Sequence, residues 1–128
     1  MNTEIAIKSD LFPSYPNEED DINPGVFGKR LAEYVKQALE KNGVAVADLY
    51  TTDHSYELRL DQFDFTVYIQ LRNEESEENR FILFIDPQKP FIRKFFKKIP
   101  TTETIKKVYD TILNAFQNDQ GIDVLSSY

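Results

Sequence analysis

The chain has 128 residues, of which 41% are hydrophobic and 29% charged, a composition that predicts one globular domain with a single core. It contains no cysteine, which excludes disulfides, thiolate catalysis, iron–sulfur clusters and Cys-ligated zinc. The formal net charge of −7 argues against general nucleic-acid binding, because polyanions repel an acidic protein at long range.

The N-terminal residues do not resemble a signal peptide, and no apolar run approaches the roughly 20 residues that a membrane span needs. We therefore expect a cytoplasmic protein without integral membrane association. Its charge is distributed unevenly along the chain. Residues 87–107 contain seven Lys and Arg against Glu103, a net charge of +6, and the rest of the chain carries −13. A local basic patch is thus predicted in an acidic protein.

Residues 1–22 are predicted to be partly loop or a mobile acidic arm of the single domain 1–128. Ile5 and Ile7 make residues 1–9 a candidate edge strand. The stretch from residue 12, FPSYPNEEDDINP, contains three prolines and four consecutive acids. Proline fixes φ and like charges repel one another, so a regular element is disfavoured there.

A helix is predicted over about 24–42, because its apolar residues recur at helical spacing and its charged residues face outward. Asn23 is a suitable N-cap and Pro24 suits the first helical position. Asn42 and Gly43 end the helix, because glycine adopts the left-handed conformation easily. The apolar stripe comprises Phe27, Leu31, Tyr34, Val35, Ala38 and Leu39.

The sequence NPGVFGKR at this helix start also raises the question of a phosphate site. Its glycine spacing fits neither a P-loop nor a dinucleotide-binding fingerprint. The acids at 18–21 would repel a phosphate, although they suit the positive end of the helix dipole. We interpret the segment as a helix start, with Gly25 and Gly28 allowing close approach to a neighbouring element.

Four strands are predicted at 44–50, 56–61, 63–72 and 80–86, the last of them central because it is apolar on both faces. Their short connections predict an antiparallel meander. A final helix over 102–118, capped by Thr101 or Thr102, follows, and IDVLS after Gly121 is a candidate for a last strand. The predicted class is α+β: an antiparallel meander sheet of four to five strands with the two main helices packed on one face.

Residues 91–99, FIRKFFKKI, are predicted to form a short amphipathic helix. Phe95 and Phe96 are then expected to be largely buried, with the basic residues on the exposed side. The same mixture of basic and aromatic residues would also suit a peripheral binder of anionic surfaces through residues 89–98. Exposure of the phenylalanines distinguishes that alternative. The basic patch consists of Arg93, Lys94, Lys97 and Lys98.

Four segments, NPGVFGKRLAEYVKQALEKNGVAV, TTDHSYEL, YIQLRN and FILFIDP, resemble an uncharacterised family of small bacterial α+β proteins. That family opens a helix with an Asn-Pro-Gly-x-x-Gly pattern and carries an acidic-aromatic motif after the first strand. The resemblance covers about residues 23–87. His54, Tyr56 and residues 70–72 depart from the family pattern. The resemblance implies an α+β fold and no particular activity.

Candidate catalytic residues are few. His54, the only histidine, could act as a general base with Asp53 in a small hydrolase or transferase. Three consecutive residues, Asp53-His54-Ser55, cannot normally adopt triad geometry, so a turn histidine is the preferred interpretation. The acidic runs at 18–21 and 74–78 lack the EF-hand spacing and are interpreted as solvated charge. We expect no metal and no cofactor.

The polar face of the predicted meander is the other candidate surface. Its proposed binding residues are Arg59, Tyr68, Gln70 and Arg72. One exposed aromatic is too few for an RNA-binding sheet. The leading hypothesis is a non-enzymatic module that binds another protein through this face and the acidic loops. An immunity-type protein that neutralises a toxin is one concrete version, by analogy with other small acidic bacterial proteins.

Overall fold

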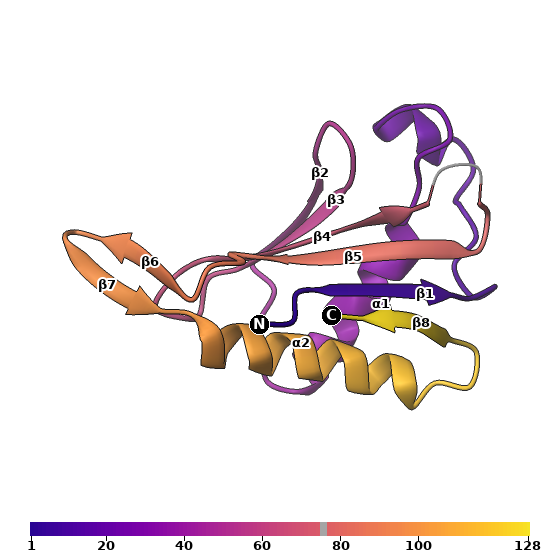
Figure 1. The fold of residues 1–128 in the computed structure, drawn as a ribbon. Coiled ribbons are helices and arrows are strands. Elements are labelled where there is room, and N and C mark those ends of the chain that lie inside the picture. The colour runs from indigo at the N-terminus through magenta and orange to yellow at the C-terminus, as the bar shows by residue number, and fades with distance from the viewer. Residues whose placement is uncertain (75–76) are drawn as a thin grey trace.

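The computed structural model describes residues 1–74 and 77–128 and is shown in Figure 1. Within this part of the chain, a 3-10 helix, two α-helices and eight strands are formed. In chain order the elements are β1 (Glu4–Lys8), η1 (Glu18–Asp21), α1 (Lys29–Lys41), β2 (Asp48–Thr51), β3 (Tyr56–Leu60), β4 (Val67–Asn73), β5 (Arg80–Asp86), β6 (Phe91–Lys94), β7 (Lys97–Pro100), α2 (Thr102–Gln117) and β8 (Asp123–Ser127).

Six strands form one antiparallel sheet in the order β2-β3-β4-β5-β1-β8, which confirms the α+β class and the meander from β2 to β5. The sheet is larger than the four to five strands expected. β1 is not an edge strand, because it pairs with β5 on one side and with β8 on the other. Its residues Ile5, Ala6 and Ile7 are all buried, as an interior position requires.

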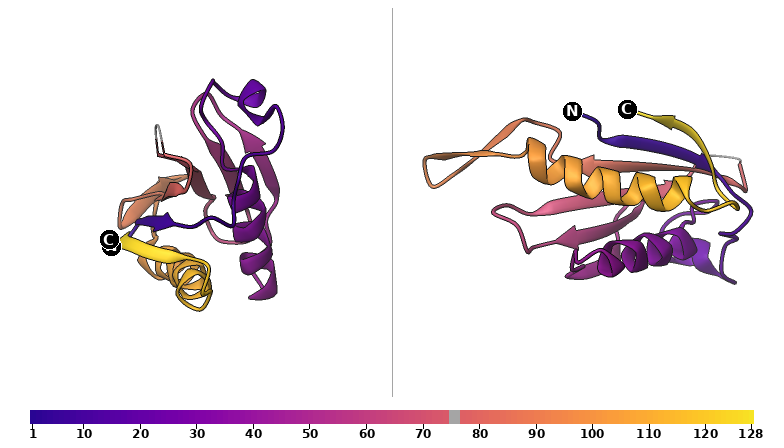
Figure 2. Two further views of the ribbon diagram at one scale, coloured as in Figure 1. Left: turned by 90° about the vertical axis from the view of Figure 1, so that its right-hand side faces the viewer. Right: turned by 90° about the horizontal axis from the view of Figure 1, so that it is seen from below.

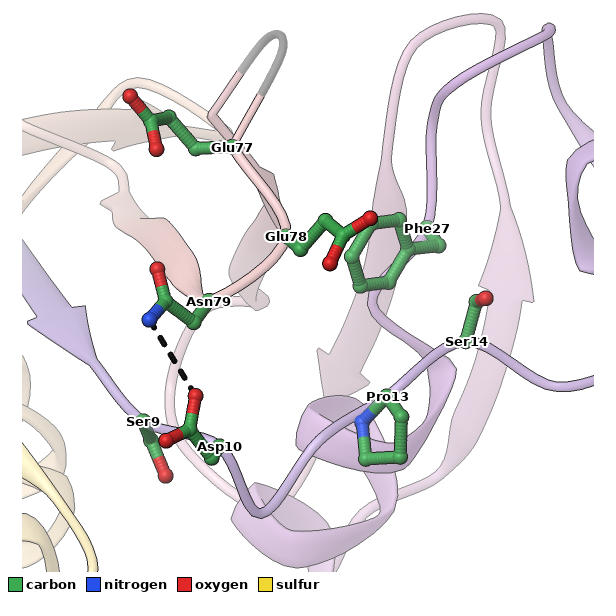
Figure 3. A pocket seen from close by; sticks show the side chains of 8 residues that line it. All are labelled: Ser9, Asp10, Pro13, Ser14, Phe27, Glu77, Glu78 and Asn79. Atoms are coloured by element: carbon green, nitrogen blue, oxygen red, sulfur yellow. Dashed lines mark hydrogen bonds between the residues drawn. The ribbon is translucent and has the colours of Figure 1, made fainter.

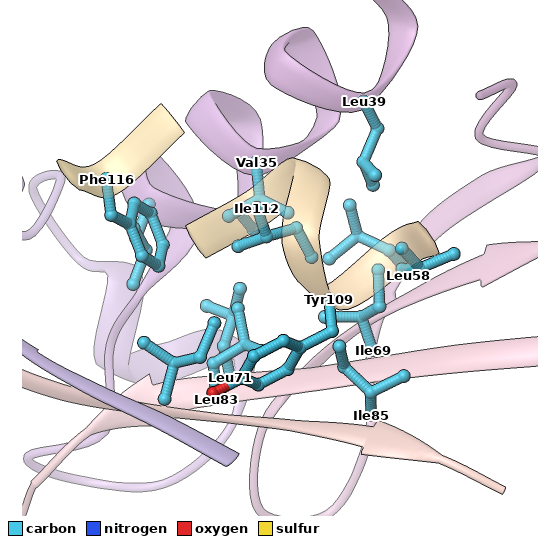
Figure 4. Close-up of a cluster of buried hydrophobic side chains, with 14 of the residues drawn as sticks. Val35, Leu39, Leu58, Ile69, Leu71, Leu83, Ile85, Tyr109, Ile112 and Phe116 are labelled. Atoms are coloured by element: carbon cyan, nitrogen blue, oxygen red, sulfur yellow. The ribbon is translucent and has the colours of Figure 1, made fainter. Parts of the chain in front are cut away.

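The core lies between one face of the sheet and the two helices. In β3, β4 and β5 alternate side chains are buried, so one complete face is removed from water. α1 contacts β3, α2 contacts β5 and β8, and the two helices contact each other. Figure 4 shows side chains of both helices meeting those of the strands. Each fully buried Leu or Ile contributes roughly 1.5–3 kcal/mol, so this layer dominates stability.

The start of α1 differs from the prediction. The helix begins at Lys29, and Asn23 does not cap it: its side-chain amide donates to the Asp53 carbonyl at 2.7 Å. The cap is Glu18, whose Oε2 accepts the N–H groups of Gly28 at 2.7 Å and Lys29 at 2.9 Å. A carboxylate satisfies unpaired helix donors and suits the positive end of the helix dipole. The protein's own acid therefore occupies the position where a phosphate would bind.

The two glycines before α1 serve different purposes. A Cβ on Gly28 would lie 3.2 Å from Leu71 Cδ1 and 3.4 Å from Arg72 Cα, so this glycine allows the close approach that was expected. Gly25 has open space around its Cα but adopts φ +81°, a left-handed conformation that favours glycine. Only Gly28 is thus required by packing against the sheet.

Residues 91–99 do not form a helix, contrary to the prediction. They form the two-stranded hairpin β6–β7, with Phe91 opposite Pro100 and Ile92 opposite Ile99. The apolar spacing of this segment fits a helix and a short hairpin equally well. A nine-residue helix gains little stability on its own, because nucleation is costly. α2 by contrast runs from Thr102 to Gln117, close to the predicted 102–118.

Candidate functional site

The β6–β7 hairpin projects beyond the end of the six-stranded sheet (Figures 1 and 2). Its base is anchored to the body. Ile92 and Ile99 are partly buried and pack against the core. Thr101 is fully buried, its N–H donates to the Pro90 carbonyl at 3.0 Å, and its hydroxyl donates to the Lys89 carbonyl. Thr101 occupies the N-cap position of α2, as expected, and its carbonyl accepts the N–H of Ile105 at 3.0 Å. Its hydroxyl makes no cap hydrogen bond to α2 and instead fixes the hairpin base.

Phe95 and Phe96 form the tip, between Lys94 and Lys97. Their side chains are not buried, contrary to the prediction: Phe95 is 86% exposed and Phe96 102% exposed. Their φ angles are 50° and 67°. Two-residue turns with positive φ at both positions favour Asn-Gly, and the left-handed conformation costs roughly 1–2 kcal/mol for other residues. The tip therefore combines a disfavoured backbone with exposed aromatic rings, a combination that points to function.

A collar of four cations surrounds this aromatic tip. Arg93 pairs with Lys98 across the strands, and Lys94 pairs with Lys97. Because successive residues of a strand alternate, the two pairs lie on opposite faces of the hairpin. All four side chains are exposed, and none forms an ion pair with a carboxylate of the described residues. The hairpin thus brings the whole predicted basic patch together.

Like charges directly opposite one another destabilise a strand pair. Here two such pairs follow in succession behind the aromatic tip. One of the four cations is held in place: Lys98 Nζ lies 4.0 Å from the centre of the Phe91 ring, a cation–π contact. Phe91 itself is 44% exposed. An external anion would relieve the repulsion within both pairs.

The predicted binding residues of the open sheet face lie together on β3 and β4, namely Arg59, Tyr68, Gln70 and Arg72. Three of them are engaged within the protein. Arg59 Nε contacts Asp61 at 3.0 Å, Gln70 donates to Glu57 at 2.9 Å, and Arg72 donates to the His54 carbonyl at 3.2 Å. These internal contacts leave the open face with fewer groups for a ligand than the hairpin has.

Tyr50 on the neighbouring strand β2 belongs to the same network. Its hydroxyl donates to the Glu57 carboxylate. Burial, followed by the hydrogen bond to Glu57, raises the pKa of Tyr50 to about 12. Tyr50 therefore keeps its proton to higher pH than a free tyrosine does, and its hydroxyl donates to Glu57.

Asp53 and His54 lie in the β2–β3 connection, and both are exposed. The Ser55 hydroxyl contacts the Thr52 hydroxyl at 2.9 Å. The backbone N–H of His54 donates to the same Thr52 oxygen at 3.3 Å. These contacts stabilise a turn, and no triad forms among these described side chains.

A pocket of roughly 680 Å³ lies at the end of the sheet opposite the hairpin (Figure 3). The residues lining it are Ser9, Asp10, Pro13, Ser14, Phe27, Glu77, Glu78 and Asn79. Asn79 donates to Asp10 at 3.2 Å, and the Glu78 side chain extends toward the Phe27 ring. Among the described residues, no group of His, Cys, Asp and Glu is placed to hold a metal ion. Two members of the predicted acidic run 74–78, residues 75 and 76, lie outside that part of the chain.

No helix in residues 1–74 and 77–128 is long and apolar enough to cross a membrane. Comparisons with protein-family models, curated proteins and solved structures gave no significant match.

The helix predicted over residues 91–99 does not account for the turn of this hairpin, although the sequence contains a signal for that turn. The letters IRKFFKKI are nearly symmetric about Phe95-Phe96, so folding the segment at this pair places Ile opposite Ile and cation opposite cation. The role of Glu18 was indicated only by its charge next to a helix start. Glu18 lies ten residues before Gly28, and the spacing rules for helix caps do not include a cap from so far along the chain.

Proposed function

We propose that the protein attaches reversibly to anionic lipid surfaces through the β6–β7 hairpin. Phe95 and Phe96 enter the boundary between headgroups and acyl chains, and the surrounding cations contact the lipid phosphates. The observation that carries the proposal is the exposure of two adjacent phenylalanines, 86% and 102%, at the tip of an anchored hairpin with cations on both faces.

The expected energies suit reversible binding. Transfer of one Phe side chain out of water contributes roughly 1.5–3 kcal/mol. Each Lys or Arg near an anionic leaflet contributes roughly 1 kcal/mol. The base of the hairpin is already fixed through Thr101, so little ordering cost remains. The hairpin thus provides both an apolar and an electrostatic signal, as stable peripheral attachment requires.

The shape of the basic collar favours a lipid surface over a protein partner. Arg93 and Lys98 lie on one face and Lys94 and Lys97 on the other, so cations surround the tip. A flat interface entered tip-first contacts both faces at once. A specific protein pocket would require directional hydrogen-bond donors and acceptors on the hairpin. The exposed polar side chains of the hairpin are all Lys or Arg, which donate hydrogen bonds and cannot accept them.

The acidic body does not prevent this attachment. The acids of η1 and, in the β4–β5 connection, Glu77 and Glu78 lie at the end of the molecule away from the hairpin (Figures 1 and 3). Strands rise about 3.3 Å per residue, so β6 and β7 hold the tip well beyond the sheet. Exposed charges are largely screened beyond about 8 Å at physiological ionic strength. The remaining repulsion keeps the acidic end away from the membrane and orients the molecule.

Co-sedimentation with vesicles tests this function. The native protein is expected to pellet with phosphatidylcholine vesicles that contain phosphatidylglycerol, and to remain in solution with phosphatidylcholine alone. Replacing Phe95 and Phe96 together with Ser should abolish pelleting. Leu125→Ser is a matched control, because it removes an exposed apolar side chain (45%) outside the hairpin. Equal binding of the tip variant and the control would overturn the proposal.

A further inference from the structure

The two faces of the hairpin are not equivalent, although each carries two cations. On one face Arg93 lies opposite Lys98, and Phe91 lies two pairs nearer the base on the same face. Lys98 Nζ is positioned 4.0 Å over the Phe91 ring. On the other face Lys94 lies opposite Lys97 at the tip, and no aromatic ring of the described residues holds either ammonium.

Directly opposed residues have their Cβ atoms about 4.5–5.5 Å apart, so Arg93 and Lys98 can reach one phosphate group together. A guanidinium binds two phosphate oxygens in a planar fork, and an ammonium adds a point charge at another oxygen. The pair Lys94 and Lys97 lacks the fork. Neither Arg93 nor Lys98 is neutralised by a carboxylate of the described residues.

We propose that Arg93 and Lys98 form a phosphate-binding site that selects lipids with a phosphomonoester headgroup, and that Phe91 is its positioning residue. A phosphomonoester carries about −1.5 to −2 charges near neutral pH, because its second pKa is near 6. It presents three free oxygens, whereas a phosphodiester headgroup presents two. The fork of Arg93 and the fixed ammonium of Lys98 match the monoester. This selectivity rests on the proposed attachment to anionic lipid.

Two charge-matched double variants test the site. One variant combines Arg93→Gln with Lys98→Gln, and the other combines Lys94→Gln with Lys97→Gln. Each variant removes two charges from one face of the hairpin, and the two variants act on opposite faces. Binding is measured by co-sedimentation with vesicles of phosphatidic acid or of phosphatidylglycerol, mixed with phosphatidylcholine to equal surface charge. We expect the native protein and the Lys94/Lys97 variant to prefer phosphatidic acid several-fold. We expect the Arg93/Lys98 variant to lose that preference.

Equal loss of binding in both variants, with no lipid preference in the native protein, would overturn the inference. General attachment would then depend on charge alone, and the proposed function would stand. Failure of the native protein to bind either vesicle would instead contradict the proposed function. The two failures are therefore distinguishable.

Phe91→Leu tests the positioning role. In the native protein the ring current should shift the Lys98 side-chain protons upfield in NMR spectra, and the shift should disappear in the variant. The preference for phosphatidic acid should fall while binding to phosphatidylglycerol is retained. An unchanged preference despite loss of the shift would contradict a role for Phe91.

Inorganic phosphate distinguishes a lipid ligand from a soluble one. Titration of the native protein should shift the Arg93 and Lys98 amide resonances more than those of Lys94 and Lys97. The same phosphate concentration should not displace the protein from phosphatidic acid vesicles, because Phe95 and Phe96 add apolar binding there. Full displacement would assign the site to soluble phosphate and overturn its assignment to lipid.

Discussion

Ile92 of β6 lies directly opposite Ile99 of β7, and this pairing leaves only Phe95 and Phe96 to form the turn. Both isoleucines pack against the core, so the register of the hairpin is set by the body of the protein. The tip residues are consequently held in positive φ whether or not their side chains suit it.

A turn of Asn and Gly should therefore stabilise the protein and remove its binding. The double variant Phe95→Asn, Phe96→Gly matches the preference of a turn with two positive φ angles. We expect the free energy of unfolding to rise by roughly 1 kcal/mol, since the strain of two bulky residues is relieved. Chemical denaturation measures this change, and vesicle co-sedimentation should show loss of attachment. A less stable variant would contradict the account of the tip.

Glu18 should contribute more to stability than Asn23. Glu18 is 3% exposed and accepts two backbone N–H groups at the start of α1. Glu18→Gln keeps the shape but removes the charge, and hydrogen bonds to charged groups contribute roughly 1.5–3 kcal/mol each. We expect a loss of about 2 kcal/mol in denaturant unfolding. Asn23→Ala, which removes an exposed hydrogen bond to Asp53, should cost less than about 1 kcal/mol. The reverse order would show that α1 is capped from Asn23.

Alkaline pH should destabilise the protein between about pH 10 and pH 12. Burial, followed by hydrogen bonds to Asp119 and Glu57 respectively, raises the pKa of Tyr34 and of Tyr50 to about 12. An unfolded tyrosine ionises near pH 10. The folded state keeps its proton longer, so this contribution to stability is complete below pH 10 and is lost as pH rises through 12. Ultraviolet absorbance measures tyrosinate formation in the folded protein, and denaturant melts at each pH measure the loss of stability. Ionisation of all seven tyrosines near pH 10 in the folded protein would contradict the expected range.

Much of the fold follows from the sequence, because its elements bury regular patterns. β5 was predicted at 80–86 and extends from Arg80 to Asp86, since its apolar run has only one strand-like interpretation. α2 has a complete apolar stripe ending at Phe116. The place of β1 could not be predicted, because strand order depends on partners far away in the chain.

The candidate site was predicted in composition but not in shape. Arg93, Lys94, Lys97 and Lys98 were recognised as one basic patch, and they do lie together. Phe95 and Phe96 were placed in the core because helical spacing of apolar residues usually means burial. In nine residues the helical and hairpin patterns coincide, and the near-symmetry of IRKFFKKI is the feature that separates them.

Tryptophan fluorescence at the tip tests insertion of the hairpin most directly. The chain contains no tryptophan, so Phe96→Trp introduces a single reporter at the most exposed aromatic position. Tyr128→Trp, at a residue that is 64% exposed and outside the hairpin, is the control. With vesicles containing phosphatidylglycerol, we expect the emission of the Phe96→Trp variant to shift to shorter wavelength and to be quenched by brominated acyl chains, while the control is unchanged. An emission of the Phe96→Trp variant that stays at the wavelength of exposed tryptophan would contradict attachment through the hairpin.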